Sequence, residues 1–186
     1  MENTEQIAQQ VQRWVEEVVV GLNLCPFARQ PLAAQQVKIA VVEAAEDAAV
    51  LQAILDELSL LQQTPAQSLE TTLLVVPRAF ADFNDYNQFL DWTDHLLEQQ
   101  GWSGVFQIAS FHPDYCFEGC APDDVSNLTN RSPYPIFHLL REASLERAIA
   151  NLENPEAIPE RNIRSMRELT DDQRRRLFPY LSTPSR

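Results

Sequence analysis

The apolar and polar positions along the chain alternate between helical and strand-like patterns. Apolar residues recur at helical spacing over residues 7–19. Asn3 or Thr4 is the expected N-cap of this helix, and Gly21 stands where a left-handed C-terminal cap is expected. Residues 22–36 contain two prolines, so we expect an irregular connection there.

Short apolar runs then alternate with helical periods. Strands are predicted at 37–42, 71–76 and 105–111, and helices at 46–63 and 82–100. One helix between each pair of strands is typical of right-handed β-α-β crossovers. The second strand is apolar on both faces, as expected for a central parallel strand.

The last third of the chain begins with a long segment without a clear period. Residues 112–135 contain four prolines, and a loop of this length in a compact domain is usually functional or disordered; its aromatic residues favour order. Helices are predicted at 136–152 and 159–176. We therefore expect one α/β domain over residues 1–186, with a small, mainly parallel sheet of about three strands flanked by helices.

Composition and charge restrict the partners. Hydrophobic residues make up 45% of the 186 residues and charged residues 22%, which fits a soluble globular domain. The net charge of −13 repels phosphate backbones and anionic lipid, so we expect neither a nucleic acid nor a membrane as partner. The N-terminus lacks the pattern of a signal peptide, and three cysteines do not form a disulfide framework; we expect a cytoplasmic protein with free thiols or metal-ligating cysteines.

Polar residues follow each predicted strand. Glu43 follows the first strand, Arg78 the second, and His112 and Asp114 the third. Ligands of parallel sheets bind beyond the carboxyl ends of the strands, so we expect titratable groups of both signs at one rim. Charged residues at strand ends are also commonly solvated without any function.

The His-Pro-Asp turn offers two kinds of chemistry. His112 can act as an acid or base that Asp114 orients, or the two can ligate a metal. With His138 they follow the order of a facial-triad site, which would hold a transition metal such as Fe or Zn. The structural alternative is that His112 caps the strand end while Asp114 forms a local turn.

An anion site is predicted just before the helix expected at 136–152. Asn130, Arg131 and Ser132 precede that helix start, where free backbone N–H groups favour a carboxylate or phosphate, and Arg131 can bind it with two N–H groups. Arg78 is a further substrate-binding candidate. Alternatively, Ser132 is an ordinary N-cap and Arg131 forms a surface salt bridge.

The cysteines leave several interpretations open. Cys25 follows a helix C-terminus, where the dipole raises a thiol pKa, so it is either a buried structural residue or a nucleophile or redox thiol. His112, Cys116 and Cys120 recur every fourth residue, and with Cys25 they would complete a zinc set of three cysteines and one histidine. A proline and a glycine within that stretch argue against a continuous helix presenting them on one face.

Five stretches carry specific motifs: GLNLCPFA at 21–28, ETTLLV at 70–75, FHPDY at 111–115, NRSPYP with HLLRE over 130–142, and IPERN at 158–162. Over nearly the whole chain they resemble the family called domain of unknown function fourteen-fifteen. This resemblance implies no activity, substrate or cofactor. It implies that Cys25, the His-Pro-Asp turn and the Asn-Arg-Ser-Pro loop belong to one site, and that cysteine is not typical at positions 116 and 120.

Three functional hypotheses follow from these residues. The preferred one is an enzyme acting on a small anionic molecule: Arg131 and the helix start hold the anion, His112 with Asp114 moves a proton, and Cys25 is the thiol. The second is a metalloenzyme that uses His112, Asp114 and His138. The third is a non-catalytic binding module whose long loop holds a partner protein.

Overall fold

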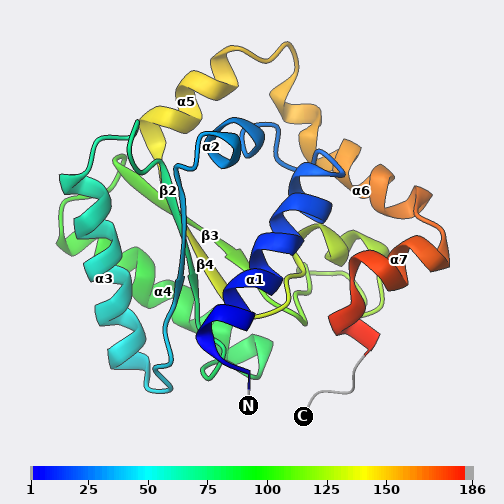
Figure 1. The fold of residues 1–186 in the computed structure, drawn as a ribbon, viewed down its shortest axis with the longest axis horizontal. Coiled ribbons are helices and arrows are strands. Elements are labelled where there is room, and N and C mark those ends of the chain that lie inside the picture. Colours follow the sequence, from blue (N-terminus) through cyan, green and yellow to red (C-terminus); the bar gives the residue numbers. More distant parts are fainter. Residues whose placement is uncertain (1, 183–186) are drawn as a thin grey trace.

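The computed structural model describes residues 2–182 of the chain, and its centre is one mixed sheet (Figure 1). Four strands lie in the order β1-β2-β4-β3. Their bounds are β1 Val37–Val41, β2 Thr71–Val75, β3 Phe106–Phe111 and β4 Ile136–Arg141. β1 and β2 are parallel, whereas β4 is antiparallel to both β2 and β3. The predicted α/β class is confirmed, but the expectation of a mainly parallel sheet of three strands was wrong.

The error arose at β4. Residues 136–152 were expected to be helical, but Ile136–Arg141 form a strand and only Glu142–Ala150, the helix α5, continue as predicted. A short apolar run of this kind fits a buried strand as well as a helix. Ile136, Phe137 and Leu139 are fully buried because β4 lies inside the sheet and helices pack on both of its faces, and this burial favours a strand.

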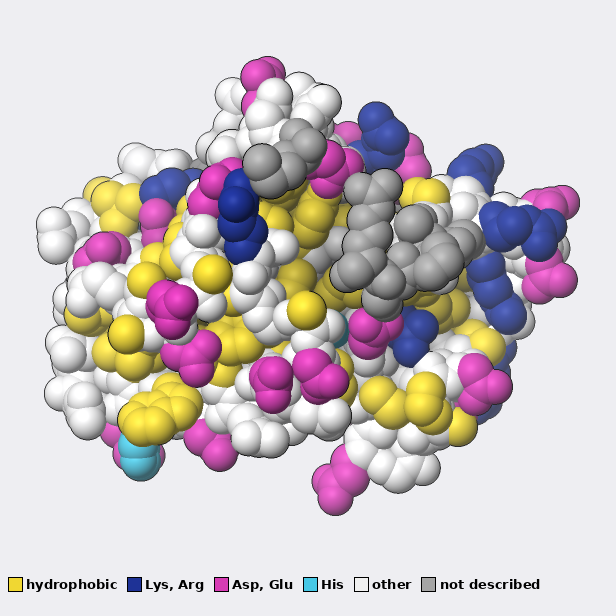
Figure 2. All heavy atoms as spheres, turned by 90° about the horizontal axis from the view of Figure 1, so that it is seen from below, with side chains coloured by type: hydrophobic (Ala, Val, Ile, Leu, Met, Phe, Trp, Pro, Cys, Tyr) yellow, Lys and Arg dark blue, Asp and Glu magenta, His cyan; other side chains and the backbone are white. Residues whose placement is uncertain are grey.

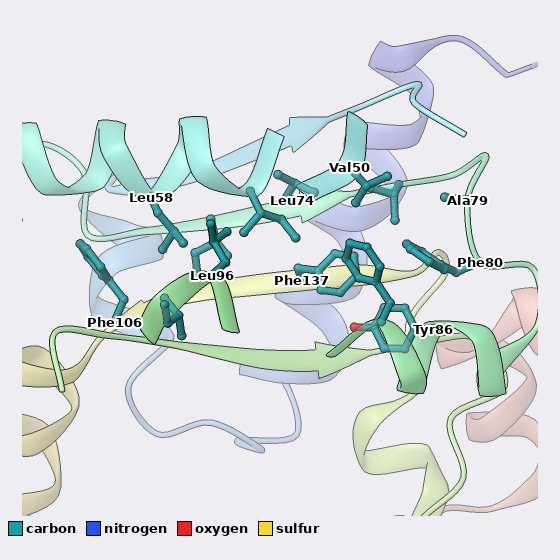
Figure 3. Packing of buried hydrophobic residues seen from close by; sticks show 14 of the residues in the cluster. Val50, Leu58, Leu74, Ala79, Phe80, Tyr86, Leu96, Phe106 and Phe137 are labelled. Atoms are coloured by element: carbon teal, nitrogen blue, oxygen red, sulfur yellow. The ribbon is translucent and has the colours of Figure 1, made fainter. Parts of the chain in front are cut away.

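Helices cover both faces of the sheet (Figure 1). On one face pack α3 (Asp47–Gln63) and α4 (Phe83–Gln99), whose apolar side chains form a core with Leu74, Phe137 and Leu139 (Figure 3). On the other face, α1 (Thr4–Trp14) packs with Leu73, Val75 and Ile136. The alternation of side chains along each strand divides these two cores.

The N-terminal helix begins as predicted and ends differently. Asn3 caps α1, and its side chain accepts from the backbone N–H of Gln6. The helix continues as a π-helix, η1, over Val15–Val20. Gly21 has an ordinary helical φ of −61°, so the predicted left-handed cap was wrong. Gly21 is required because a Cβ there would lie 2.2 Å from the backbone oxygen of Glu17.

Two further segments differ from expectation. The connection predicted at 22–36 contains a short helix, α2 (Arg29–Ala33). Pro31 is tolerated there because it lies in the first turn, where the N–H that proline lacks would have no partner within the helix. The single helix predicted at 159–176 is two, α6 (Ile158–Glu168) and α7 (Asp171–Leu177), because the side chain of Thr170 caps a new helix start. The remaining helices are the 3₁₀ segments η2 Val125–Asn130, η3 Pro155–Ala157 and η4 Pro179–Ser182.

None of the helices in the described part of the chain is both long and apolar enough to cross a membrane.

Candidate functional site

One edge of the sheet collects segments that are far apart in the sequence. β1, β2 and β3 all end at this edge, and β4 begins there because it runs in the opposite direction. The segments after β1, β2 and β3 therefore lie near the segment before β4. At this rim, a guanidinium nitrogen of Arg78 lies 3.1 Å from a carboxylate oxygen of Glu43, and both side chains are about half exposed.

An open cleft of about 1980 Å³ lies at this edge. Its walls are the polar face of α1, the loops after β2 and β3, the segment before β4, and the end of α7 with η4. Figure 2 looks onto this end of the molecule, where hydrophobic side chains lie in the hollow among charged ones. Of the candidates that the sequence indicated, Arg78, His112, Asp114 and Arg131 line the cleft.

His112 is buried at the cleft wall, and both of its ring nitrogens bind the backbone. Its Nε2 lies 2.8 Å from the carbonyl oxygen of Phe80, and its Nδ1 accepts a hydrogen bond of 3.0 Å from the backbone N–H of Asp114. These partners define the neutral form with the proton on Nε2. Burial lowers the pKa of His112, against the opposing effect of the Phe80 carbonyl.

Asp114 does not orient His112 as predicted. The contact runs through the backbone N–H of Asp114, whereas its side chain is exposed. The imidazole instead packs against α4, with ring centroids 5.4 Å from Phe83 and 5.2 Å from Tyr86. The geometry is that of a satisfied buried histidine at a strand end.

His138 lies away from this group, on the other face of the sheet. It alternates along β4 with Phe137, which belongs to the core beneath α3 and α4, and it shares the α1 face with Ile136. Burial lowers its pKa to about 4. His112 contacts α4 and so lies on the opposite face.

The metal sites predicted from the sequence do not form. Within residues 2–182, no group of three or more His, Cys, Asp or Glu side chains is placed to hold a metal ion. The three ligands expected at His112, Asp114 and His138 are therefore not brought together. The same holds, within the described residues, for the zinc set of Cys25, His112, Cys116 and Cys120.

Arg131 holds the loop together and has no helix start beside it. Its Nε donates to the carbonyl oxygen of Tyr115 at 3.2 Å, and a terminal nitrogen donates to that of Pro122 at 2.6 Å. Ser132 is buried, and its hydroxyl donates to Tyr134. Because β4 follows, the free N–H groups expected from a helix are absent from this described segment, and that part of the anion site was wrong.

Asn130 also has a local structural partner. Its side-chain nitrogen donates to the carbonyl oxygen of Ser110 at 3.2 Å, while its own carbonyl accepts from the N–H of His112. Asn130 thus fastens the loop to the end of β3 and does not line the cleft.

Cys25 lies outside the cleft as well. It follows η1 in the segment that α6 holds: Asn162 donates to the carbonyl of Leu24 at 2.7 Å, and Arg161 to that of Asn23 at 2.9 Å. Burial raises the pKa of the Cys25 thiol, and the nearby N–H groups of the following residues offset this only in part. The structure does not bring Cys25 to His112.

Two arginines of the cleft were not among the site residues predicted from the sequence. Arg13 lies on α1 and Arg176 on α7, and both side chains are exposed. Among residues 2–182, neither guanidinium group makes a hydrogen bond or an ion pair. The helical period indicates that Arg13 lies on a polar face, but which part of the fold that face borders depends on tertiary packing.

The comparison with known proteins gives a family without an activity. A family model described as "Protein of unknown function (DUF1415)" matches residues 6–176. No curated protein matches the chain significantly. No solved structure does so either.

Proposed function

The chain belongs to the family of unknown function DUF1415, and we propose that it binds a small anionic molecule in the cleft at the carboxyl edge of its sheet. The observation that carries this proposal is the charge of the cleft. Four arginines line it, against the three acidic residues Glu2, Glu17 and Asp114. The whole chain has a net charge of −13, so a lining in which arginines outnumber acidic residues is a local reversal, although Glu43 at the rim pairs with Arg78.

The availability of two of these arginines supports the same conclusion. Arg78 is engaged with Glu43, and Arg131 with two carbonyl oxygens. Arg13 and Arg176 have no such partner in the described part of the chain, so their N–H groups can bind carboxylate or phosphate oxygens. The cleft exceeds the roughly 300–1,000 Å³ typical of small-molecule pockets, so an anion of nucleotide size also fits.

His112 supports the cleft as a positioning residue under this proposal. Taking up a proton at Nδ1 would break the hydrogen bond from Asp114, and giving one up from Nε2 would break the bond to Phe80. A group with both nitrogens engaged is a poor acid or base. Binding, which needs no such proton transfer, is therefore the function that the geometry supports best.

Calorimetric titration with pyrophosphate and with succinate, at low ionic strength, tests the proposal. Arg13→Gln and Arg176→Gln should each weaken binding of the better probe by about tenfold or more, the effect of losing one charge-assisted hydrogen bond. Arg164→Gln is the matched control, because it removes the same charge from an exposed position of α6 outside the cleft. Equal losses in all three variants, or no binding of either probe, would contradict a site in the cleft.

A further inference from the structure

Two cysteines lie close together in the loop between β3 and β4. Cys116 and Cys120 are half-buried free thiols, and neither lines the cleft. The Sγ of Cys116 lies 3.4 Å from the carbonyl oxygen of Cys120, so this side chain reaches across the turn. Standard covalent geometry then places that Sγ within about 6 Å of the Cys120 Cα.

Both thiols contact side chains of the same short helix, η2. The Sγ of Cys120 lies 3.7 Å from the hydroxyl of Ser126, and the Sγ of Cys116 lies 3.8 Å from the side-chain nitrogen of Asn127. Since Ser126 and Asn127 are consecutive in η2, both sulfurs lie against one short segment.

The turn that joins the cysteines has room to adjust. The N–H of Cys120 donates to the carbonyl oxygen of Phe117 at 3.0 Å, which reverses the chain. Gly119 adopts a φ of +75°, and a Cβ built there would meet no atom within 4 Å. Gly119 thus faces open space, while the N–H of Phe117 donates to the side-chain oxygen of Asn127 at 3.0 Å and holds the turn against η2. A disulfide requires Cα atoms about 4.4–6.8 Å apart, a separation that such a chain reversal allows.

The rest of the loop is anchored just outside the pair. Arg131 binds the carbonyl oxygens of Tyr115 and Pro122, and Asn127 binds that of Ala121 at 2.9 Å. These contacts flank the cysteines on both sides. A bond between the sulfurs would close a ring inside the anchored loop and would not require the anchors to open.

We propose that Cys116 and Cys120 form a reversible intramolecular disulfide when the protein meets a hydroperoxide. One thiolate attacks a peroxide oxygen, the O–O bond breaks, and a sulfenic acid and water form. The second thiolate then attacks the sulfenic sulfur and displaces its oxygen as a second water. Two thiols and one hydrogen peroxide thus give one disulfide and two waters, and a dithiol reductant reverses the oxidation.

The third cysteine serves as an internal control. Cys25 lies in the segment held by α6, and burial favours its neutral thiol form. The thiolate is the reactive form of cysteine, so Cys25 should remain reduced under mild oxidation. The inference concerns the loop alone and does not rest on the proposed anion site.

Mild oxidation of the full-length protein tests the proposal. The reduced protein is treated with a small excess of hydrogen peroxide. The intact mass should fall by about 2 Da, the mass of the two hydrogen atoms that two thiols lose when they form a disulfide. Thiols titrated in denaturant should fall from the three free cysteines to one. Glutamyl endopeptidase cleaves after Glu118, which is exposed between the two cysteines. The peptides on either side of this cut should stay joined until a reductant is added.

Variants identify the pair. Cys116→Ser and Cys120→Ser should each abolish the loss of mass and the joined fragments, while Cys25→Ser should retain both. A circular dichroism spectrum identical to that of the parent shows that each variant is folded. Gain of oxygen without loss of two protons, disulfide-linked dimers as the main product, or a disulfide that survives in Cys116→Ser would each overturn the proposal.

Discussion

At the scale of single residues, His112 connects two walls of the cleft through the backbone. Phe80, whose carbonyl His112 binds, is buried with a φ of +57°, a conformation that bulky residues rarely adopt. Such strain costs on the order of 1–3 kcal/mol and persists only where the surroundings hold it. The hydrogen bond from His112 and the rings of Tyr86 and Phe137 around Phe80 provide this support (Figure 3).

Removing the imidazole should therefore destabilise the fold. We expect His112→Ala to lower the free energy of unfolding by about 3 kcal/mol, because it leaves a cavity and unpairs the Phe80 carbonyl and the Asp114 N–H. Urea unfolding at pH 7.5 measures this loss. His95→Ala, on the exposed side of α4, is the control and should change stability by less than about 0.5 kcal/mol. If His112→Ala changed stability as little as His95→Ala, the two hydrogen bonds of His112 would contribute little to the stability of the fold.

The partly buried His138 makes stability depend on pH. Burial holds its pKa at about 4, below the ordinary 6.5. Below pH 6.5 the unfolded chain takes up a proton that the folded chain refuses until about pH 4. Stability is thus full above pH 6.5 and falls by about 1.4 kcal/mol per unit between these values.

The measurement compares the native protein with His138→Leu in urea at pH 7.5 and pH 5.0. The native protein should lose about 2 kcal/mol more than the variant over this interval. Since His112 is present in both proteins, its own titration cancels in the comparison. Equal losses would mean that His138 is accessible to protons in the folded state.

At the scale of elements, the helical spacing of apolar residues and the capping residues correctly predicted the helices that bury one face and expose the other. α3 and α4 follow their apolar period because one face of each packs on the sheet, and α1 begins at its predicted cap. β4 escaped prediction because it runs directly into α5, and its short apolar run also fits the helical spacing that continues there. The break between α6 and α7 depends on one capping threonine within a continuous polar pattern.

The end of the π-helix offers a test at this scale. Gly21→Ala should cost more than about 2 kcal/mol, because its Cβ would collide with the backbone oxygen of Glu17, which cannot move without the helix. Gly104→Ala is the control: a Cβ there meets nothing, and only its φ of +76° opposes the change, at a cost of about 1 kcal/mol. Urea unfolding measures the loss of stability in both variants. If Gly21→Ala costs less than Gly104→Ala, the proposed collision of a Cβ with the Glu17 oxygen is wrong.

At the scale of the whole molecule, the fold concentrates arginine side chains in a cleft of an acidic protein. Arg13, Arg131 and Arg176 come from a helix near the N-terminus, a loop and a helix near the C-terminus, and they line one cavity only because α1 and α7 pack on the same side of the sheet. The excess of negative charge lies elsewhere on the molecule. Folding and ligand binding should therefore respond to salt in opposite directions.

Salt should stabilise the folded protein while weakening the binding of anions. Raising sodium chloride from about 10 to about 200 mM shortens the Debye length from roughly 30 Å to below 10 Å, which screens the self-repulsion of a chain with net charge −13. We expect Tm, followed by circular dichroism, to rise. Pyrophosphate affinity should fall over the same range. A falling Tm would show that local ion pairs outweigh the overall repulsion.

The sequence by itself determined the α/β class, most helices, three of the four strands and the family. These depend on local periods, caps and motifs that each segment carries alone. Only the tertiary structure decided the direction of β4, and with it the separation of His112 from His138 and the lack of a helix start beside Arg131 in the described chain. It also decided that Arg13 and Arg176 line one cleft. Whether two residues meet depends on strand order and face, which arise from how the whole chain buries its apolar surface.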